Sequence, residues 1–337
     1  MSATHFGFRL LACAVLGGLL IAGPAGSAQA APKIIKVGHA LPASDPAHMG
    51  WTKFKEELEK RAGDRYKVEI FPNQELGSDR ELVEACQMGE IQMATASPSN
   101  MATFVNDLFV LDVPFSFTDR ADVFGKLDGE LGKALEASIN SKGFFVLGWW
   151  ENGFRHLSNS KVAVRQASDL KGLKVRTMEN PIHLVAWKAM GANPTPMVFG
   201  EVFTALQQGT IDGQENPYTI ILTMRFYEVQ KYVTETGHIF SPYVAMINEE
   251  YYQELSAEDQ AMFRECSAIA AAYQREVAAK FVDDAKQKII DHPGTEVIVL
   301  TPEERATFSA ATDAALKEIE GRVKPEIIEI FKKGLPR

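Results

Sequence analysis

Two arginines lie in stretches of sequence that have the pattern of buried β-strands. Arg155 follows the apolar run FFVLGWW in the segment ENGFRHLSN, and Arg176 lies in LKVRTMENP. A guanidinium group keeps its proton at physiological pH, so a buried arginine needs an anion close by. One source is the chain itself, which offers three nearby acids: Glu151, Glu179 and Glu215. The other is a ligand carboxylate, which a guanidinium binds through two parallel N–H···O bonds.

An Asn-Pro pair follows each of two strand-like segments and is placed to begin a helix. Asn180 and Pro181 come shortly after Arg176, as an N-cap and a first-turn proline, and Asn216-Pro217 repeats the device in GQENP. Ligands bind at the carboxyl ends of parallel strands in open α/β sheets, and helix N-termini favour anions. Asn216 is therefore either a plain helix cap or an amide that holds a ligand oxygen.

Strand patterns alternate with helical patterns along most of the chain. The strand pattern of 33–39 precedes an amphipathic helix over 49–63, and a second helix begins at Ser78, where Glu81 completes a capping box, and ends before Gly89. This alternation predicts an α/β protein with parallel strands and helices on both faces of the sheets.

A weak internal repeat indicates two units of similar build. ELVEACQMGEIQM (81–93) and EVFTALQQGTIDG (201–213) align at an offset of 120, and each has the pattern of a helix, a glycine stop and a strand. A chain of 337 residues also exceeds one ordinary hydrophobic core. We therefore expect two lobes with the ligand cleft between them.

The segment 256–294 predicts one long helix, which begins at a Ser256/Asp259 cap and ends at Pro293-Gly294. Some 36 helical residues would reach about 54 Å, which is longer than one lobe. We expect this helix to span both lobes, and a homodimer through it stays open. The expected boundaries are 31–152 plus 241–280 for lobe I, and 153–240 plus 281–337 for lobe II.

Composition and targeting signals place the protein outside the cytoplasm. Residues 1–30 combine a basic start, an apolar run and the small-residue site AQA, which predicts a signal peptide and export to a bacterial periplasm. The net charge of −9 argues against nucleic acid or an anionic membrane as partner, so an anion site has to be built locally. Cys86 and Cys266 lie in apolar helical contexts and are expected to be free thiols rather than a disulfide.

The common catalytic and metal-binding motifs are missing from the sequence. There is no G-x-S-x-G, G-x-G-x-x-G, G-x-x-x-x-G-K, H-E-x-x-H or C-x-x-C, and the histidines lack ligand spacing. We therefore predict a binding protein with no catalytic residues, metal or cofactor. A periplasmic sugar-acid lyase, and a receptor for an ABC transporter or a sensor kinase, are the alternatives.

Four blocks, in this order, carry a family resemblance: NQELGSDRELVEACQMGEIQMA, WWENGFRHLSN, SDLKGLKVRTMENP and GEVFTALQQGTIDGQENP. Together they resemble the solute-binding subunits of TRAP (tripartite ATP-independent periplasmic) transporters, the C4-dicarboxylate-binding-protein-like family. The resemblance covers essentially the whole chain after residue 30. It implies a two-lobed periplasmic binding protein of type II-like fold that closes on its ligand.

The resemblance also implies partners and site residues. Members deliver their ligand to a small and a large membrane subunit that run on an ion gradient, usually of sodium. The arginine that matches Arg176 is the family's near-universal carboxylate partner, and the residues that match Arg155 and Asn216 commonly touch the ligand. The anion that the two arginines require is then expected to be the solute.

Three further residues bear on the choice of solute within the family. Glu75, in the loop NQELG, would repel a second carboxylate but accept hydroxyl protons, and Asn152 and His39 offer neutral polar bonds. This set favours a monocarboxylate with several hydroxyls, a hexuronate or aldonate, over a C4-dicarboxylate or 2-oxo acid. Glu75 could instead be solvent-exposed and His39 a core histidine. Three aromatic residues are candidates to pack on a sugar ring or are ordinary core: Trp150, Phe199 and Tyr218.

Overall fold

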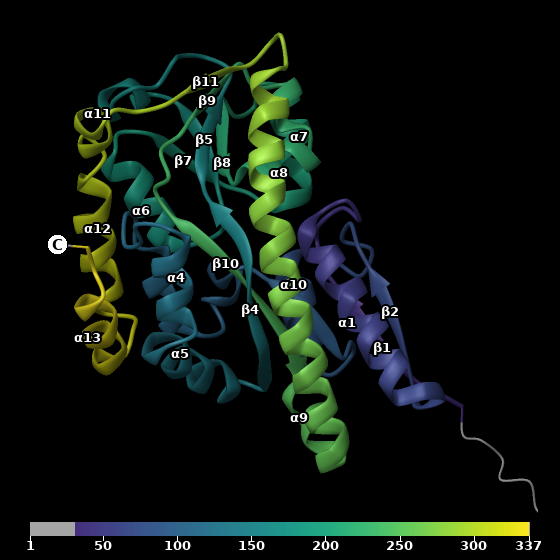
Figure 1. Cartoon of the computed structure of the whole chain (residues 1–337). Helices are drawn as coiled ribbons and strands as arrows, with labels where there is room; N and C mark the ends of the chain where they lie inside the picture. Colours follow the sequence, from purple (N-terminus) through teal and green to yellow (C-terminus); the bar gives the residue numbers. More distant parts are fainter. Residues whose placement is uncertain (1–30, 337) are drawn as a thin grey trace, which may run out of the picture. The chain divides into compact units, whose positions relative to one another are not determined.

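The computed structural model describes residues 31–336, and the predicted signal peptide, residues 1–30, lies outside them. Two mixed β-sheets organise the described chain (Figure 1). The first sheet has the strand order β2 (Tyr66–Phe71), β1 (Lys33–Gly38), β3 (Met93–Ala96), β10 (Phe240–Asn248) and β4 (Phe144–Phe154). The second has the order β11 (Glu296–Ile298), β9 (Tyr232–Thr234), β5 (His156–Asn159), β8 (Gly213–Asn216), β6 (Lys174–Thr177) and β7 (Asn193–Pro196).

The expectation of parallel strands is right for part of each sheet only. β1, β2 and β3 are parallel, as are β6, β7 and β8, but β10 is antiparallel to both β3 and β4, and β5 is antiparallel to β8 and β9. The antiparallel strands are those next to the crossings between the sheets. The chain leaves β4 of the first sheet and enters β5 of the second across the single residue Arg155, and it returns from β9 to β10 across residues 235–239.

The two halves of the internal repeat adopt the same local structure. Helix α2 (Asp79–Gln87) leads through Gly89 to β3, and α7 (Val202–Gln207) leads through Gly209 to β8. Both glycines have positive φ, +77° and +69°, a conformation that other residues adopt with strain. The repeat therefore places two matching strands, β3 and β8, one in each sheet. The residues at their carboxyl ends are candidates for the site.

Helix starts follow the predicted capping signals. The Ser78 side chain accepts a hydrogen bond from the Glu81 amide, with the capping box complete. Asn180 caps α6 (Pro181–Ala189) by accepting from the amides of Ile182 and His183. Ser256 caps the long helix α10 (Ala257–Ile290).

Helix α10 packs beside elements of both sheets. It contacts α1 (Pro46–Ala62) and β4 on the side of the first sheet, and α8 (Tyr218–Thr223) and β11 on the side of the second (Figure 1). Its 34 residues span about 51 Å, so the predicted bracing helix is confirmed. A homodimer through it stays a prediction.

The other α-helices of residues 31–336 are α3 (Pro98–Met101), α4 (Arg120–Leu127), α5 (Glu130–Asn140), α9 (Glu249–Glu254), α11 (Pro302–Ala306), α12 (Ala310–Ile319) and α13 (Pro325–Lys333). Helix α12 packs against α6, whereas α13 packs against α5 and a 3₁₀ helix, Asn106–Asp112. The C-terminal helices thus contact helices next to both sheets, because α6 follows β6 of the second sheet and α5 precedes β4 of the first. The lobe boundaries expected above stay a prediction.

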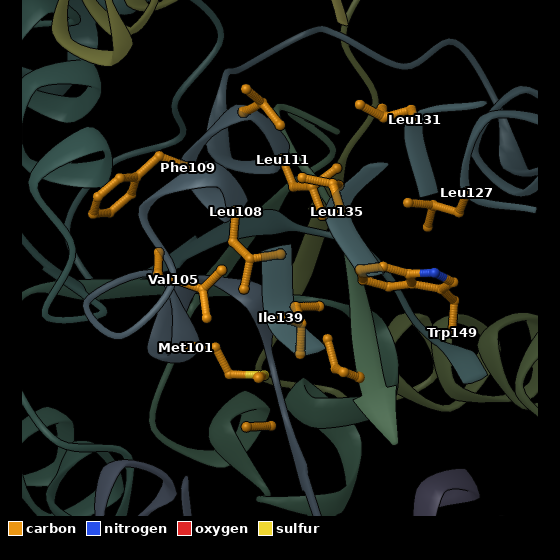
Figure 2. Packing of buried hydrophobic residues seen from close by; sticks show 14 of the residues in the cluster. Met101, Val105, Leu108, Phe109, Leu111, Leu127, Leu131, Leu135, Ile139 and Trp149 are labelled. Atoms are coloured by element: carbon orange, nitrogen blue, oxygen red, sulfur yellow. The ribbon is translucent and has the colours of Figure 1, made fainter. Parts of the chain in front are cut away.

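Both faces of the first sheet are buried, because alternate residues of β10 enter different cores. Val244 and Met246 join the cluster that contains α5, while Ala245 and Ile247 join the cluster that contains α1. Figure 2 shows the first cluster, where leucines of α4 and α5 and Trp149 of β4 enclose Leu108 and Leu111 of the 3₁₀ helix. Cys86 and Cys266 are buried free thiols, as expected. Within residues 31–336, no helix is long and apolar enough to cross a membrane.

Truncation of Leu135 tests this core. Leu135 is fully buried in the cluster of Figure 2. Leu135→Ala should lower the free energy of unfolding by about 2–5 kcal/mol, because the side chain's transfer energy is lost and a cavity remains. Urea denaturation followed by circular dichroism measures the change. Met88→Ala is the control, because Met88 is 74% exposed and its truncation should cost about 0.5 kcal/mol or less. Equal losses in the two variants would contradict the assignment of this core.

Candidate functional site

A pocket lies where the carboxyl ends of strands from both sheets meet. It has about 360 Å³ of empty space, part of which is open solvent. β3, β6 and β8 end at it, and the β4–β5 crossing forms part of its wall. Its lining combines charged, amide and apolar side chains: Leu41, Asp79, Ser97, Asn100, Asn152, Arg155, Arg176, Met178, Phe199, Asn216, Ile220 and Tyr243.

Arg176, on β6, is a buried cation without a carboxylate partner in the described chain. Only 3% of the residue is exposed, and its Nε and Nη2 both donate to the backbone oxygen of Met197, at 3.0 and 2.6 Å. No carboxylate oxygen of residues 31–336 lies within 4.0 Å of its nitrogens. Burial lowers the pKa of Arg176 to about 10, so the group stays charged at neutral pH. One edge of the guanidinium is thus fixed by a carbonyl, and the charges of Glu215, Asp79 and Glu179 act on it from beyond 4.0 Å.

Arg155, at the β4–β5 crossing, has an internal counter-charge. Its Nε and Nη2 donate to the two carboxylate oxygens of Glu215 at 2.5 and 2.8 Å, and both side chains are almost fully buried. The hypothesis that both arginines lack a partner from the chain is therefore wrong for Arg155. Glu215 lies on the adjacent β8, where it is opposite Leu157 of β5, two residues after Arg155. Of the other two acids considered, Glu151 pairs with Arg120 and Glu179 is exposed.

Asp79 places a carboxylate in the same pocket. It is the first residue of α2 and lines the pocket together with Arg176. Burial raises the pKa of Asp79 to about 6, although Arg176 and a hydrogen bond with Asn100 oppose the rise. The carboxylate is therefore ionised at neutral pH and can accept hydrogen bonds from hydroxyl or ammonium groups.

Two asparagines supply neutral polar atoms. Asn152 is 5% exposed, and its Oδ1 has no hydrogen-bond partner among the described residues, although its Nδ2 lies 3.4 Å from Ser241 Oγ. A buried acceptor of this kind is costly until a donor reaches it. Asn216 ends β8, and its Nδ2 donates to Gln214 Oε1 at 2.6 Å. It is not a helix cap, since Pro217 occupies the cap position of α8.

The structure brings four of the six predicted site residues together and leaves two outside the lining. Arg176, Arg155, Asn216 and Asn152 line the pocket. Their contact with a ligand stays a prediction.

Glu75 is an exposed residue of the turn after β2 and does not line the pocket. His39 is 1% exposed, and both of its ring nitrogens have partners within the chain: Nδ1 accepts from the Leu41 amide at 3.2 Å, and Nε2 lies 3.0 Å from His48 Nδ1. Burial lowers the pKa of His39 to about 3. Neither residue offers a free polar atom to the pocket, and their ligand contacts stay predictions without geometric support.

Sequence reasoning missed Asp79 and the residues around it. Ser97 and Asn100 follow β3, at positions that the repeat offset of 120 relates to Pro217 and Ile220 behind β8. The repeat could therefore have pointed to them, since Asn216 was already a candidate. Of the three aromatic candidates, Phe199 lines the pocket, whereas Trp150 is fully buried core and Tyr218 lies outside the lining. No group of three or more His, Cys, Asp or Glu side chains within residues 31–336 could hold a metal ion.

Comparisons with known proteins agree with this geometry. Residues 37–322 match the family described as bacterial extracellular solute-binding protein, family 7. The chain is 36% identical, over 93% of its length and 95% of the relative, to the 2,3-diketo-L-gulonate-binding periplasmic protein YiaO of Escherichia coli.

Two solved structures show the same fold with different ligands. The sugar acid binding protein DctPAm of Advenella mimigardefordensis, in complex with galactonate, superposes with a TM-score of 0.86 at 31% identity, over 91% of this chain and all of that one. A TRAP periplasmic solute binding protein of Shewanella oneidensis with bound succinate gives 0.86 at 32% identity, over 90% of this chain and 99% of that one. The family match over residues 37–322, the identity to a relative along most of the chain and the shared two-lobed α/β fold show that this protein belongs to family 7 of the bacterial extracellular solute-binding proteins, the solute-binding subunits of TRAP transporters.

Proposed function

We propose that the pocket captures a sugar acid, a monocarboxylate with several hydroxyl groups such as a hexuronate or an aldonate, for delivery to the membrane subunits of a TRAP transporter. The observation that carries the proposal is that one pocket is lined by both a positive and a negative side chain. Among residues 31–336, no carboxylate pairs with the buried Arg176, and Asp79 lines the same space. A ligand with a carboxylate at one end and hydroxyls along its body satisfies both.

Hydrogen-bond needs on the pocket wall support the same class of ligand. Asn152 Oδ1 lacks a donor and Asp79 is an acceptor, so both require donor groups, which hydroxyls provide. Ser97, Asn100 and Asn216 add polar atoms that can either donate or accept. Phe199 and Ile220 provide apolar surface for a carbon chain or ring.

A C4-dicarboxylate is the second candidate. Arg155 and Arg176 both line the pocket, and the relative from Shewanella oneidensis binds succinate. Two features oppose it here, because Glu215 already neutralises Arg155, and Asp79 would repel a second carboxylate.

Delivery would take place in the periplasm. Family members are periplasmic solute-binding proteins that work with membrane subunits. For this chain we infer that residues 1–30 direct export and that the loaded, closed form is handed to a small and a large membrane subunit.

A thermal-shift screen of organic acids tests the proposal. Galactonate, glucuronate and galacturonate should raise the melting temperature more than succinate, malate, fumarate or pyruvate at equal concentration. A ligand at 100 times its Kd adds about 2.7 kcal/mol to the free energy of unfolding, because it binds only the folded state. Shifts with the dicarboxylates alone would reject the sugar-acid assignment, and turnover of a uronate would favour a lyase.

Removal of the Arg176 guanidinium should abolish most of the binding. Arg176→Ala should weaken affinity for the best acid of the screen by about 2–5 kcal/mol, since the ligand carboxylate would stay desolvated and unpaired. Arg176→Lys should lose much of the same energy, because one ammonium cannot form two parallel bonds. Isothermal titration calorimetry measures both. Arg225→Ala is the control, since Arg225 is an exposed arginine that pairs with Glu228 outside the pocket. Wild-type affinity in Arg176→Ala would refute the role.

Neutralising Asp79 should change ligand preference. Asp79→Asn should weaken a hydroxylated acid, by about tenfold or more, and strengthen succinate, because a charge-assisted acceptor and a repulsive charge are removed together. Competition calorimetry at pH 7.5 gives the ratio of the two affinities. Glu75→Gln is the matched control, because Glu75 is an exposed acid near the pocket but not in its lining. If Glu75→Gln shifts the ratio and Asp79→Asn does not, the selecting acid is Glu75.

A further inference from the structure

A group of buried polar side chains lies next to Arg155 of the pocket lining, and His183 is at its centre. His183 lies on α6 and is fully buried. Asp112, from the 3₁₀ helix of residues 106–112, and Glu215, from β8, approach it from two directions, and both are buried. Neither acid is exposed to water, so their charges have to be balanced by neighbouring side chains.

The two ring nitrogens of His183 face different carboxylates. Nε2 lies 3.1 Å from Asp112 Oδ1, and Nδ1 lies 3.8 Å from Glu215 Oε1. A neutral imidazole has one N–H and one lone pair. Either neutral tautomer would therefore point a lone pair at a carboxylate oxygen in a buried place. The 3.8 Å separation is not a hydrogen bond, and Nδ1 has no hydrogen-bond partner among the described residues. Nδ1 and Glu215 are close enough for an ion pair, and only the doubly protonated ring turns an N–H toward both acids, so the geometry favours an imidazolium.

The electrostatic surroundings agree with a charged ring. Burial by itself would lower the pKa of His183, but the contacts with Asp112 and Glu215 outweigh it and raise the pKa to about 9. His238 also contacts Glu215, with Nε2 3.0 Å from Oε2, yet burial lowers the pKa of His238, so it stays neutral. Arg155 is the other cation of the group.

The groups that face the ring come from every side of it. Ser99 of α3 lies 3.5 Å from Nε2, and Asn180 at the start of α6 donates to Asp112 Oδ2 at 2.7 Å. Helix α12 packs along α6, but within the described chain none of its charged side chains forms an ion pair or hydrogen bond with the ring. The charged groups of this cluster are thus two carboxylates, Asp112 and Glu215, and two cations, Arg155 and His183. Glu215 also acts on Arg176 in the pocket.

We propose that His183 is a charged positioning residue for ligand capture. Its imidazolium supplies the second positive charge that balances Asp112 and Glu215, so that these two carboxylates do not repel an anionic ligand. Without this charge, Glu215 would keep its ion pair with Arg155, but Asp112 would lose the positive charge of His183 close to the pocket. The inference rests on the proposed capture of a carboxylate, and it adds a residue that does not line the pocket.

The protonation state of His183 can be read without any ligand. Two-bond ¹H–¹⁵N NMR spectra of the full mature protein at pH 7 should show both ring nitrogens of His183 at imidazolium shifts, with the change to neutral near pH 9. His238 should show the neutral pattern in the same spectrum. His183→Gln and His238→Gln assign the two signals. A neutral His183 at pH 7 overturns the inference, even if His183→Gln fails to fold.

Charge-balancing variants test the consequence for binding. His183→Gln should weaken affinity for the best acid of the thermal-shift screen by about tenfold or more at pH 7.5, because one uncompensated negative charge is left near the ligand. The double variant D112N/H183Q restores neutrality and should recover most of the loss. A defect of packing alone would not be repaired by a second substitution in the same buried cluster, so a double variant as weak as H183Q overturns the inference.

The pH profile provides a further readout. Wild-type affinity should begin to fall near pH 9, because the ring then loses its charge, whereas in His183→Gln the fall should begin only near pH 10, where Arg176 loses its own charge. His238→Gln is the matched control, since it removes a neutral ring from the same Glu215 and should keep the fall near pH 9. If no organic acid binds the wild type, the proposed function fails while the NMR result still decides the charge of His183. If acids bind and the fall still begins near pH 9 in His183→Gln, only the role of His183 fails.

Discussion

The site depends on one buried positive charge that the described chain leaves unbalanced at close range. Arg176 is almost fully buried, yet its hydrogen bonds go to a backbone carbonyl and its nitrogens have no carboxylate within 4.0 Å. Desolvation of such a group costs several kcal/mol, which is recovered only when an anion pairs with it. In the proposed contact with Arg176, the binding free energy of an anionic ligand includes relief of a cost already present in the ligand-free protein. This explains how a chain of net charge −9 can hold an anion, since the attraction is local rather than a property of the whole field.

The architecture serves to bring that charge to the meeting point of two sheets. Arg176 is the last residue but one of β6 and Asn216 is the last residue of β8, both in the second sheet, and β3 of the first sheet ends just before Ser97. The repeat makes the two sides alike, so a ligand meets strand ends and helix starts from both. Arg155 is the single residue between β4 and β5, and its backbone amide bonds to Ile239 in the return crossing. A residue at this crossing has to be held firmly, which explains why its partner Glu215 comes from the chain and not from the solute.

Local signals predicted the elements well, and long-range pairing set the limit of prediction. The caps at Ser78, Asn180 and Ser256 and the length of α10 depend on residues a few positions apart, and all four are confirmed. Strand periodicity showed that Arg155 would be buried but not what it would meet, because Glu215 is 60 residues away. The prediction of parallel strands was wrong at β5 and β10 for the same reason. An alternating pattern shows which face of a strand is buried, not the direction of its neighbour.

The same limit applies to Glu75, the acid that the sequence predicts for the site and that does not line the pocket. Glu75 and Asp79 are four residues apart, and both follow β2, so sequence alone gave no ground to separate them. The turn over 73–76 leaves Glu75 exposed, whereas Asp79 begins α2 and lines the pocket. A carboxylate close to the arginines favours a hydroxylated acid over a dicarboxylate in the proposed site, and Asp79 lines the pocket with both arginines. The pocket therefore has a direction, positive at Arg176 and accepting at Asp79 and Asn152. A molecule with one carboxylate and several hydroxyls fits this direction, whereas a second carboxylate would place like charges together in a partly buried space.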